Sequence, residues 1–132
     1  NNYANGEFSP EAYKESRMTE RVDRKWGYYK VLHKGDGFTV KELTIFPGKT
    51  LSDQRHFNRS EHWLVMKGTL RIDFQRPGLP PKKIVSEGVE DFYIPQGCWH
   101  RPHNLGRENV VVIETWIGES SEDDIERRRM FD

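Results

Sequence analysis

The chain has 132 residues and a mass of 15.6 kDa, the size of a single domain. Its 21 basic and 21 acidic residues give a formal net charge of zero. That balance argues against a protein that binds nucleic acid or a membrane surface through bulk positive charge. No run approaches the roughly 20 apolar residues of a membrane helix, so we expect neither nucleic acid nor membrane as a partner. Hydrophobic residues make up only 34% of the chain, but 7 Phe, 5 Tyr and 4 Trp can build a small core.

The only cysteine is Cys98, which cannot form a disulfide within the chain. Nothing in the cysteine usage therefore indicates an oxidising compartment. The start of the sequence also lacks the charged and apolar regions of a secretory signal. We therefore expect a cytoplasmic protein.

The first 25 residues are polar, and Ser9-Pro10-Glu11 is typical of a helix start, which predicts a short helix over about residues 10–18. From Trp26 onward the sequence becomes β-prone. Residues 26–32 predict a strand, 34–37 a turn and 38–46 a second strand that ends at Pro47.

The second half continues in short β-prone runs. Residues 62–74 predict a long β segment with a turn at Gly68, and 77–81 predict a loop. Short strands are expected at 84–85 and 91–94, and the strongest strand signal covers 110–117. The tail, 119–132, is acidic and then basic, and we expect a short exposed helix there, capped near Ser120 or Ser121. About seven or eight short strands without intervening helices predict an all-β antiparallel sandwich or barrel.

A group of polar residues at predicted strand edges could bind a metal ion. Gln54 and His56 are two positions apart, so both side chains point to one face of an extended strand, and Glu61 and His100 would join them from other strands. Two imidazoles, a carboxylate and an amide oxygen suit a divalent transition ion that keeps an open position. Spacing alone equally allows ordinary surface histidines without a function.

The other three histidines are interpreted as ordinary residues. His62 falls on the opposite face from Glu61, His33 lies beside a turn, and His103 is out of phase with His100. At most, His103 would line the mouth of a pocket.

The spacing of these residues resembles the two cupin motifs, with Gln54 in place of the first histidine. The motifs are Gly48-x5-Gln54-x-His56-x4-Glu61-x6-Gly68 and Pro95-x-Gly97-x2-His100-x3-Asn104. More narrowly, the chain resembles the cupin domain of type II mannose-6-phosphate isomerases, which follows the nucleotidyltransferase domain in bifunctional mannose-1-phosphate guanylyltransferases. The segments specific to this subgroup are Arg59-Ser60-Glu61-His62-Trp63 and Glu122-Asp123-Asp124-Ile125. Phe57 and Asn58 stand where the family has further histidines, and Glu42 where it commonly has a basic residue.

The resemblance implies one cupin domain over residues 1–132. Its fold would be a double-stranded β-helix, or jelly-roll barrel, with its core at about 24–118 and short peripheral helices at the termini. It also implies a homodimer. The metal ligands would be Gln54, His56, Glu61 and His100, with zinc as the first choice of ion and manganese, iron or nickel as alternatives.

The implied activity is the interconversion of mannose 6-phosphate and fructose 6-phosphate, in the supply of nucleotide sugars. In this reaction Lys41 or Arg101 would meet the phosphate or stabilise enediolate charge, and Glu114 would serve as the base if it faces the barrel interior. For all three residues, a solvent-facing position without a catalytic role stays open. Other cupin functions also stay open: a metal-dependent dioxygenase, an enzyme acting on another sugar, or a non-catalytic sugar-binding module.

Overall fold

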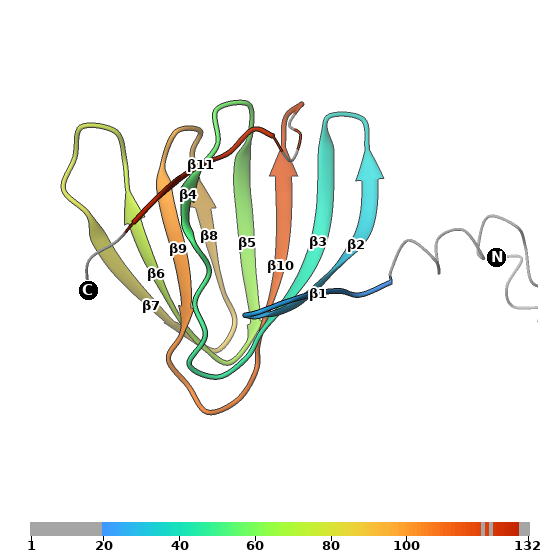
Figure 1. Ribbon diagram of the computed structural model, residues 1–132, viewed down its shortest axis with the longest axis vertical. Helices are drawn as coiled ribbons and strands as arrows, with labels where there is room; N and C mark the ends of the chain where they lie inside the picture. The colour runs from blue at the N-terminus through green and yellow to red at the C-terminus, as the bar shows by residue number, and fades with distance from the viewer. Residues whose placement is uncertain (1–19, 120, 122, 130–132) are drawn as a thin grey trace, which may run out of the picture.

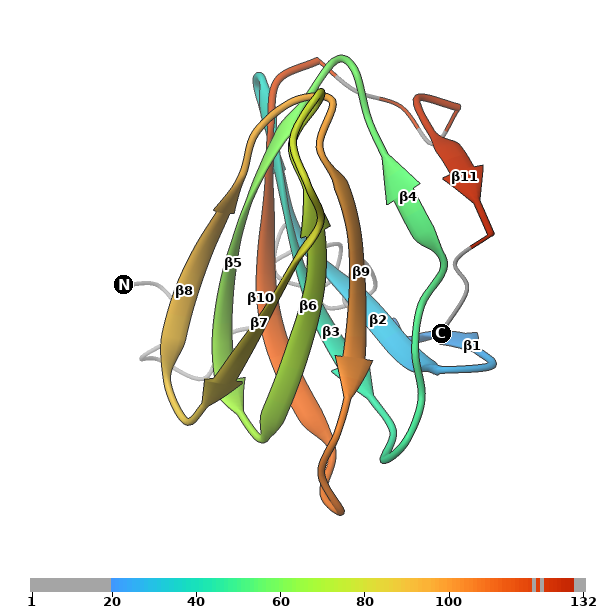
Figure 2. The same cartoon turned by 90° about the vertical axis from the view of Figure 1, so that its left-hand side faces the viewer.

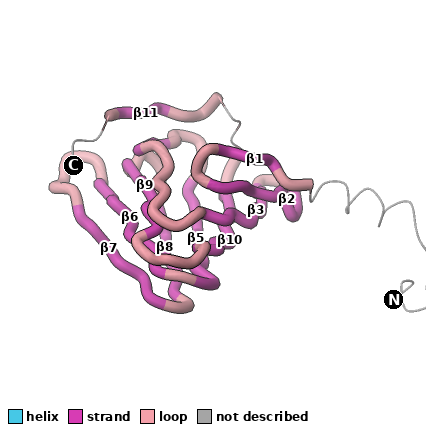
Figure 3. The backbone as a smooth tube through the Cα atoms, turned by 60° about the horizontal axis from the view of Figure 1, so that its bottom comes forward, coloured by secondary structure: helices cyan, strands magenta, loops and turns pink. Residues whose placement is uncertain are grey.

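A computed structural model describes residues 20–119, 121 and 123–129 of the chain. In this part the chain is built from strands and loops, and two antiparallel sheets face each other to form a barrel (Figures 1, 2 and 3). The strands are β1 (Val22–Arg24), β2 (Gly27–Gly35), β3 (Phe38–Ile45), β4 (Asp53–Arg55), β5 (Ser60–Lys67), β6 (Thr69–Gln75), β7 (Lys82–Glu87), β8 (Glu90–Ile94), β9 (Trp99–Asn104), β10 (Val110–Ile117) and β11 (Glu126–Arg128). The predicted all-β jelly-roll fold is confirmed.

The larger sheet has the order β1-β2-β3-β10-β5-β8, and the smaller has the order β11-β4-β9-β6-β7. The chain passes from one sheet to the other between β5 and β6, at the predicted turn of Gly68. This glycine has a φ of +93°, and a Cβ atom there would lie 2.8 Å from the Cγ2 of Val110. Only glycine accepts both the left-handed backbone and the close approach without strain.

The hydrophobic core lies between the two sheets, because alternate residues of each strand point inward. Its members are Leu43, Ile45, Trp63, Val65, Leu70, Ile72, Ile94, Cys98, Val110 and Val112. Four strands of the larger sheet supply most of these side chains, and β6 supplies Leu70 and Ile72 from the opposite wall.

The tail prediction is wrong in the described residues, because residues 126–128 form strand β11 rather than a helix. β11 pairs with β4 in an antiparallel arrangement and lies beside it in Figures 1 and 2.

The helix predicted over about 10–18 lies outside the described residues. The strands β1, β4, β9 and β11 were not predicted as such. Among the described residues, no helix has the length and apolar character needed to cross a membrane.

Candidate metal and sugar site

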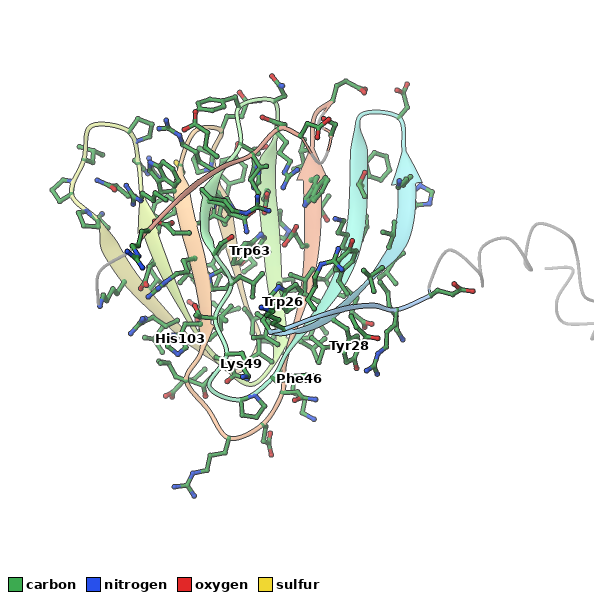
Figure 4. The ribbon with its side chains drawn as sticks, in the orientation of Figure 1. Trp26, Tyr28, Phe46, Lys49, Trp63 and His103 are labelled. Carbon is green, nitrogen blue, oxygen red and sulfur yellow. The ribbon has the colours of Figure 1, made fainter. Side chains whose placement is uncertain are left out.

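A pocket with a cavity volume of about 120 Å³ lies inside the barrel. Both sheets line it: the larger through β2, β3, β5 and β10, the smaller through β4, β9 and β11. Its charged and polar lining residues are Lys41, Gln54, His56, Arg59, Glu61, His100, Glu114 and Arg127. Four aromatic residues, Trp26, Tyr29, Trp63 and Trp116, complete much of the wall. Trp26 and Trp63 are labelled in Figure 4, in the central part of the barrel.

Three of the predicted ligands form a compact cluster that could hold a metal ion. One ligand atom each from His56, Glu61 and His100 lie within 4.8 Å of one another, and all three residues are buried. The Nε2 atom of His56 lies 3.2 Å from Oε2 of Glu61, and the Nε2 atom of His100 lies 3.8 Å from Oε1. The two imidazoles therefore approach one carboxylate, His100 from β9 and His56 from the loop that follows β4.

The second ring nitrogen of each histidine is bound to a backbone carbonyl. Nδ1 of His56 lies 2.7 Å from the carbonyl oxygen of Asp124, and Nδ1 of His100 lies 3.0 Å from that of Cys98. A carbonyl can only accept, so the Nδ1–H group donates in each ring and Nε2 is the nitrogen that faces the cluster. Histidines that bind metals show this arrangement almost always. The donor set of this cluster therefore fits a transition ion.

Arg59 is buried beside this cluster. Its Nε donates to Oε2 of Glu61 at 2.9 Å, and its NH2 group donates to Nε2 of His56, also at 2.9 Å. Burial lowers the pKa of His56 to about 4, so the ring is neutral at physiological pH. Burial alone would raise the pKa of Glu61, but His100 and Arg59 outweigh it and hold that pKa below its usual value. The cluster thus combines a carboxylate with at least one neutral imidazole, as a divalent ion requires.

The larger sheet, which also carries Glu61, places a lysine and a carboxyl group side by side on neighbouring strands. Glu114 on β10 lies in register with Lys41 on β3 and with Trp63 on β5, and both Glu114 and Lys41 are buried. Burial raises the pKa of Glu114 to about 8, and the neighbouring Glu61 carboxylate adds to this effect. The indole Nε1 of Trp116 donates to Glu114, and the Lys41 ammonium lies 3.8 Å from the Trp116 ring centroid. Glu114 therefore faces the barrel interior, and it can hold or release a proton near neutral pH.

Of two further predicted residues, Gln54 lies beside the cluster and Arg101 lies outside the pocket. Gln54 lines the pocket and lies in register with His100 across β4 and β9, so the structure brings it beside the cluster. Arg101 does not join the pocket, because it follows His100 directly on β9 and points to the other side of the sheet. There its guanidinium pairs with Asp73 at 3.2 Å. The structure therefore places Arg101 outside the pocket, apart from the other predicted site residues.

Two arginines, Arg59 and Arg127, line the pocket, and neither was predicted as a site residue. For Arg59 the signal was present, because it opens the Arg-Ser-Glu-His-Trp segment two residues before Glu61. Arg127 could not be found without β11, which places it in register with Gln54.

A barrel of two antiparallel sheets with a His, His and carboxylate cluster inside defines the cupin class of proteins. Solved structures agree with this class. The capsular polysaccharide assembling protein CapF from Staphylococcus aureus superposes with a TM-score of 0.76 over 84% of this chain and 34% of its own, at 22% identity. An oxalate decarboxylase from Bacillus subtilis gives a TM-score of 0.70 over 82% of this chain and 30% of its own, at 17% identity. At such identities the likeness concerns the fold.

The chain belongs to the family described as "Mannose-6-phosphate isomerase C-terminal", which matches residues 11–130. A mannose-1-phosphate guanylyltransferase of Escherichia coli is 36% identical over 110 residues, which are 83% of this chain and 22% of that protein. The alginate biosynthesis protein AlgA of Pseudomonas aeruginosa is 37% identical over 107 residues, 80% of this chain and 21% of its own. The chain thus spans about a fifth of the length of these relatives.

Proposed function

We propose that this cupin is a metal-dependent sugar-phosphate isomerase that interconverts mannose 6-phosphate and fructose 6-phosphate. One observation carries the proposal: a single pocket holds a His-His-Glu cluster, a carboxyl group with a pKa of about 8, and several cationic side chains. An aldose–ketose isomerisation moves a proton between C1 and C2 and needs these three kinds of group. Membership of the family supports the choice of substrate.

In this proposal Gln54, His56, Glu61 and His100 hold the ion, with zinc as the first choice and manganese, iron or nickel as alternatives. The bound ion would supply a Lewis acid for the oxygens of the sugar. Glu114 takes the proton from one carbon and returns it to the next, because its raised pKa allows both states near neutral pH. The aromatic wall supports this role, since it keeps Glu114 away from bulk water.

The cationic residues of the pocket bind the anionic parts of the substrate. Lys41 and Arg59 are buried at its wall and suit the negative charge of an enediolate. Arg127 lines the pocket from β11 and is exposed, so it suits the phosphate, which keeps part of its hydration. Arg101 has no part in this proposal because of its place on the outer face.

The experiment is a coupled assay for fructose 6-phosphate with the purified chain. The protein is first freed of metal and then supplied with zinc, manganese or cobalt in turn. We expect turnover with at least one ion, and loss of both metal and turnover in His100→Ala. Glu114→Gln should keep the metal and lose turnover, because it removes the proton carrier and spares the ligands.

An absence of turnover with every ion would contradict the isomerase, and undiminished metal content in both His56→Ala and His100→Ala would contradict the ligand set. The second candidate is a sugar-binding cupin without turnover. It is favoured by Arg59, whose hydrogen bonds to His56 and Glu61 already give these residues a cationic partner. The four aromatic side chains in the pocket wall would suit the apolar face of a sugar ring. Tight binding of a sugar by metal-free protein, without turnover, would favour this candidate.

A further inference from the structure

The C-terminal strap, residues 123–129, lies alongside the first motif of the barrel. Its strand β11 pairs with all three residues of β4. Two ion pairs tie the strands together outside the pocket, between Glu126 and Arg55 and between Arg128 and Asp53. Ile125 and Arg127 line the pocket itself. The strap is therefore part of the wall of the site, although it follows the last barrel strand in the sequence.

One residue of the strap, Asp124, contacts three consecutive residues that lie 66 to 68 positions earlier in the chain. Its carbonyl oxygen accepts from Nδ1 of His56 at 2.7 Å. Its carboxylate oxygens accept from the backbone N–H groups of Phe57 and Asn58, each at 2.9 Å. Hydrogen bonds from backbone amides to a carboxylate are of the strong, charge-assisted kind.

The two histidines of the cluster differ in what orients them. His100 lies within β9, flanked by ladder partners, and its Nδ1 binds Cys98 on its own strand. His56 follows the last residue of β4 and lies in a loop, so strand pairing does not hold its ring. Its Nδ1 partner comes from the distant strap, and the loop residues after it are held by the Asp124 carboxylate.

We propose that Asp124 is a positioning residue for His56. Its carboxylate fixes the loop of residues 56–58, and its carbonyl then selects the tautomer with the proton on Nδ1. Nε2, which accepts from Arg59 in this structure, is thereby left without a proton beside Glu61 and His100. The use of the Nε2 lone pair for a metal rests on the proposed function, but the control of the tautomer does not.

The test compares Asp124→Ala and Asp124→Asn with wild type, in the full chain, and Asp123→Ala serves as the control. Asp123 is exposed and lies next to Asp124. A long-range ¹H–¹⁵N spectrum of the metal-free protein at pH 7 reports the tautomer of His56. Wild type and Asp123→Ala should show the Nδ1–H form. Asp124→Ala should show a mixture of tautomers, and Asp124→Asn, which keeps one acceptor oxygen, a smaller change.

Cobalt titration, followed by visible absorbance, provides the second readout. Loss of a group that orients a ligand costs about 10- to 100-fold in metal affinity, and we expect this loss for Asp124→Ala and less for Asp124→Asn. If Asp124→Ala does not fold, Asp124→Asn decides both readouts. An unchanged tautomer in the folded Asp124 variants would overturn the inference. A wild type that shows the Nδ1–H form but binds no cobalt would overturn the proposed metal site and leave the inference standing.

Discussion

The two ends of the barrel interior are built by the same strands but have opposite chemistry. On β10, Val110 and Val112 are 0% and 1% exposed and belong to the apolar core, while the next inward residues, Glu114 and Trp116, line the pocket. On β3 the inward residues change from apolar to charged between Leu43 and Lys41. These two strands therefore contribute to the apolar core at one end and to the site at the other.

The difference shows what each end needs for stability. The apolar end is stabilised by removal of its side chains from water, at roughly 25 cal/mol per Å² of buried apolar surface. The polar end buries charges, which is unfavourable unless each has partners. Glu61 meets this condition through Arg59 and the indole of Trp63. The site is therefore a network in which loss of one member affects the others.

The largest effect is expected from Glu61→Ala, which removes the common partner of the network. Glu61 is 2% exposed, and its loss breaks the buried ion pair with the Arg59 guanidinium. Breaking a buried ion pair costs about 3–5 kcal/mol of unfolding free energy, which urea unfolding can measure. Glu61→Gln should cost less because the amide oxygen can still accept. Glu87→Ala, at an exposed position, is the control; an equal, small loss in both alanine variants would show that the network does not stabilise the polar end.

A slightly smaller loss is expected at the apolar end from Ile72→Ala. Ile72 is 1% exposed and packs in the core from β6. Such a substitution costs about 2–5 kcal/mol through lost burial and the cavity left behind. Urea unfolding measures it, with Val85→Ala on the neighbouring β7 as the exposed control. Metal binding should persist in the folded variant, and its loss would contradict the division of the barrel into two ends.

The pH dependence of stability should also separate the two ends. Glu114 has a pKa of about 8 in the folded state against an ordinary value of 4.5, so the folded protein holds more protons between these pH values. The contribution of Glu114 to the free energy of unfolding therefore falls as the pH rises from 4.5 to 8. His56, with a pKa of about 4 against 6.5, acts in the opposite direction below pH 6.5. Between pH 6.5 and 8 only the fall from Glu114 remains, about 1–2 kcal/mol.

Thermal or urea unfolding from pH 5 to 9 checks this expectation. Glu114→Gln should flatten the curve between pH 6.5 and 8, since its amide does not titrate. Ile72→Ala should lower the curve without changing its slope. A wild-type curve that is flat above pH 6.5 would contradict the raised pKa of Glu114.

The sequence predicted the apolar end better than the polar end, and the missed strands show why. Runs such as 110–117 signal a strand through β-branched residues, but β11 consists of Glu126, Arg127 and Arg128, which have weak strand propensity. It forms because Arg55 and Asp53 on β4 supply opposite charges in register. Because the paired charges lie about 70 positions apart, the sequence around β11 alone does not indicate a strand.

Strand β9 was missed because of Pro102, which ordinarily argues against a central strand. Here the carbonyl of Pro102 accepts from the backbone N–H of Leu51 and the hydroxyl of Thr50, at a point where β4 has not yet begun. The nitrogen of Pro102 points to the same side as its carbonyl, so the missing N–H interrupts no hydrogen bond to β4. The clustering of His56, Glu61 and His100 could be predicted, since their types and spacing follow the motif. Alternation along an extended segment excluded His62 and His103, and the same rule applied to Arg101 would have excluded it as well.

The smallest effect is expected from Arg101→Ala, which tests the inside against the outside of the smaller sheet. Asp73 is buried and loses one partner but keeps Arg71 at 3.0 Å, so the unfolding free energy should fall by less than the about 3–5 kcal/mol of a fully broken buried pair. Metal affinity and isomerase turnover should match wild type, because the guanidinium lies on the other face from His100. Arg127→Ala is the matched variant at the pocket: it should raise KM for the sugar phosphate and leave stability nearly unchanged, since Arg127 is exposed. Steady-state kinetics of both variants decide the matter. A raised KM in Arg101→Ala with a normal KM in Arg127→Ala would move the phosphate site to the outer face of the sheet.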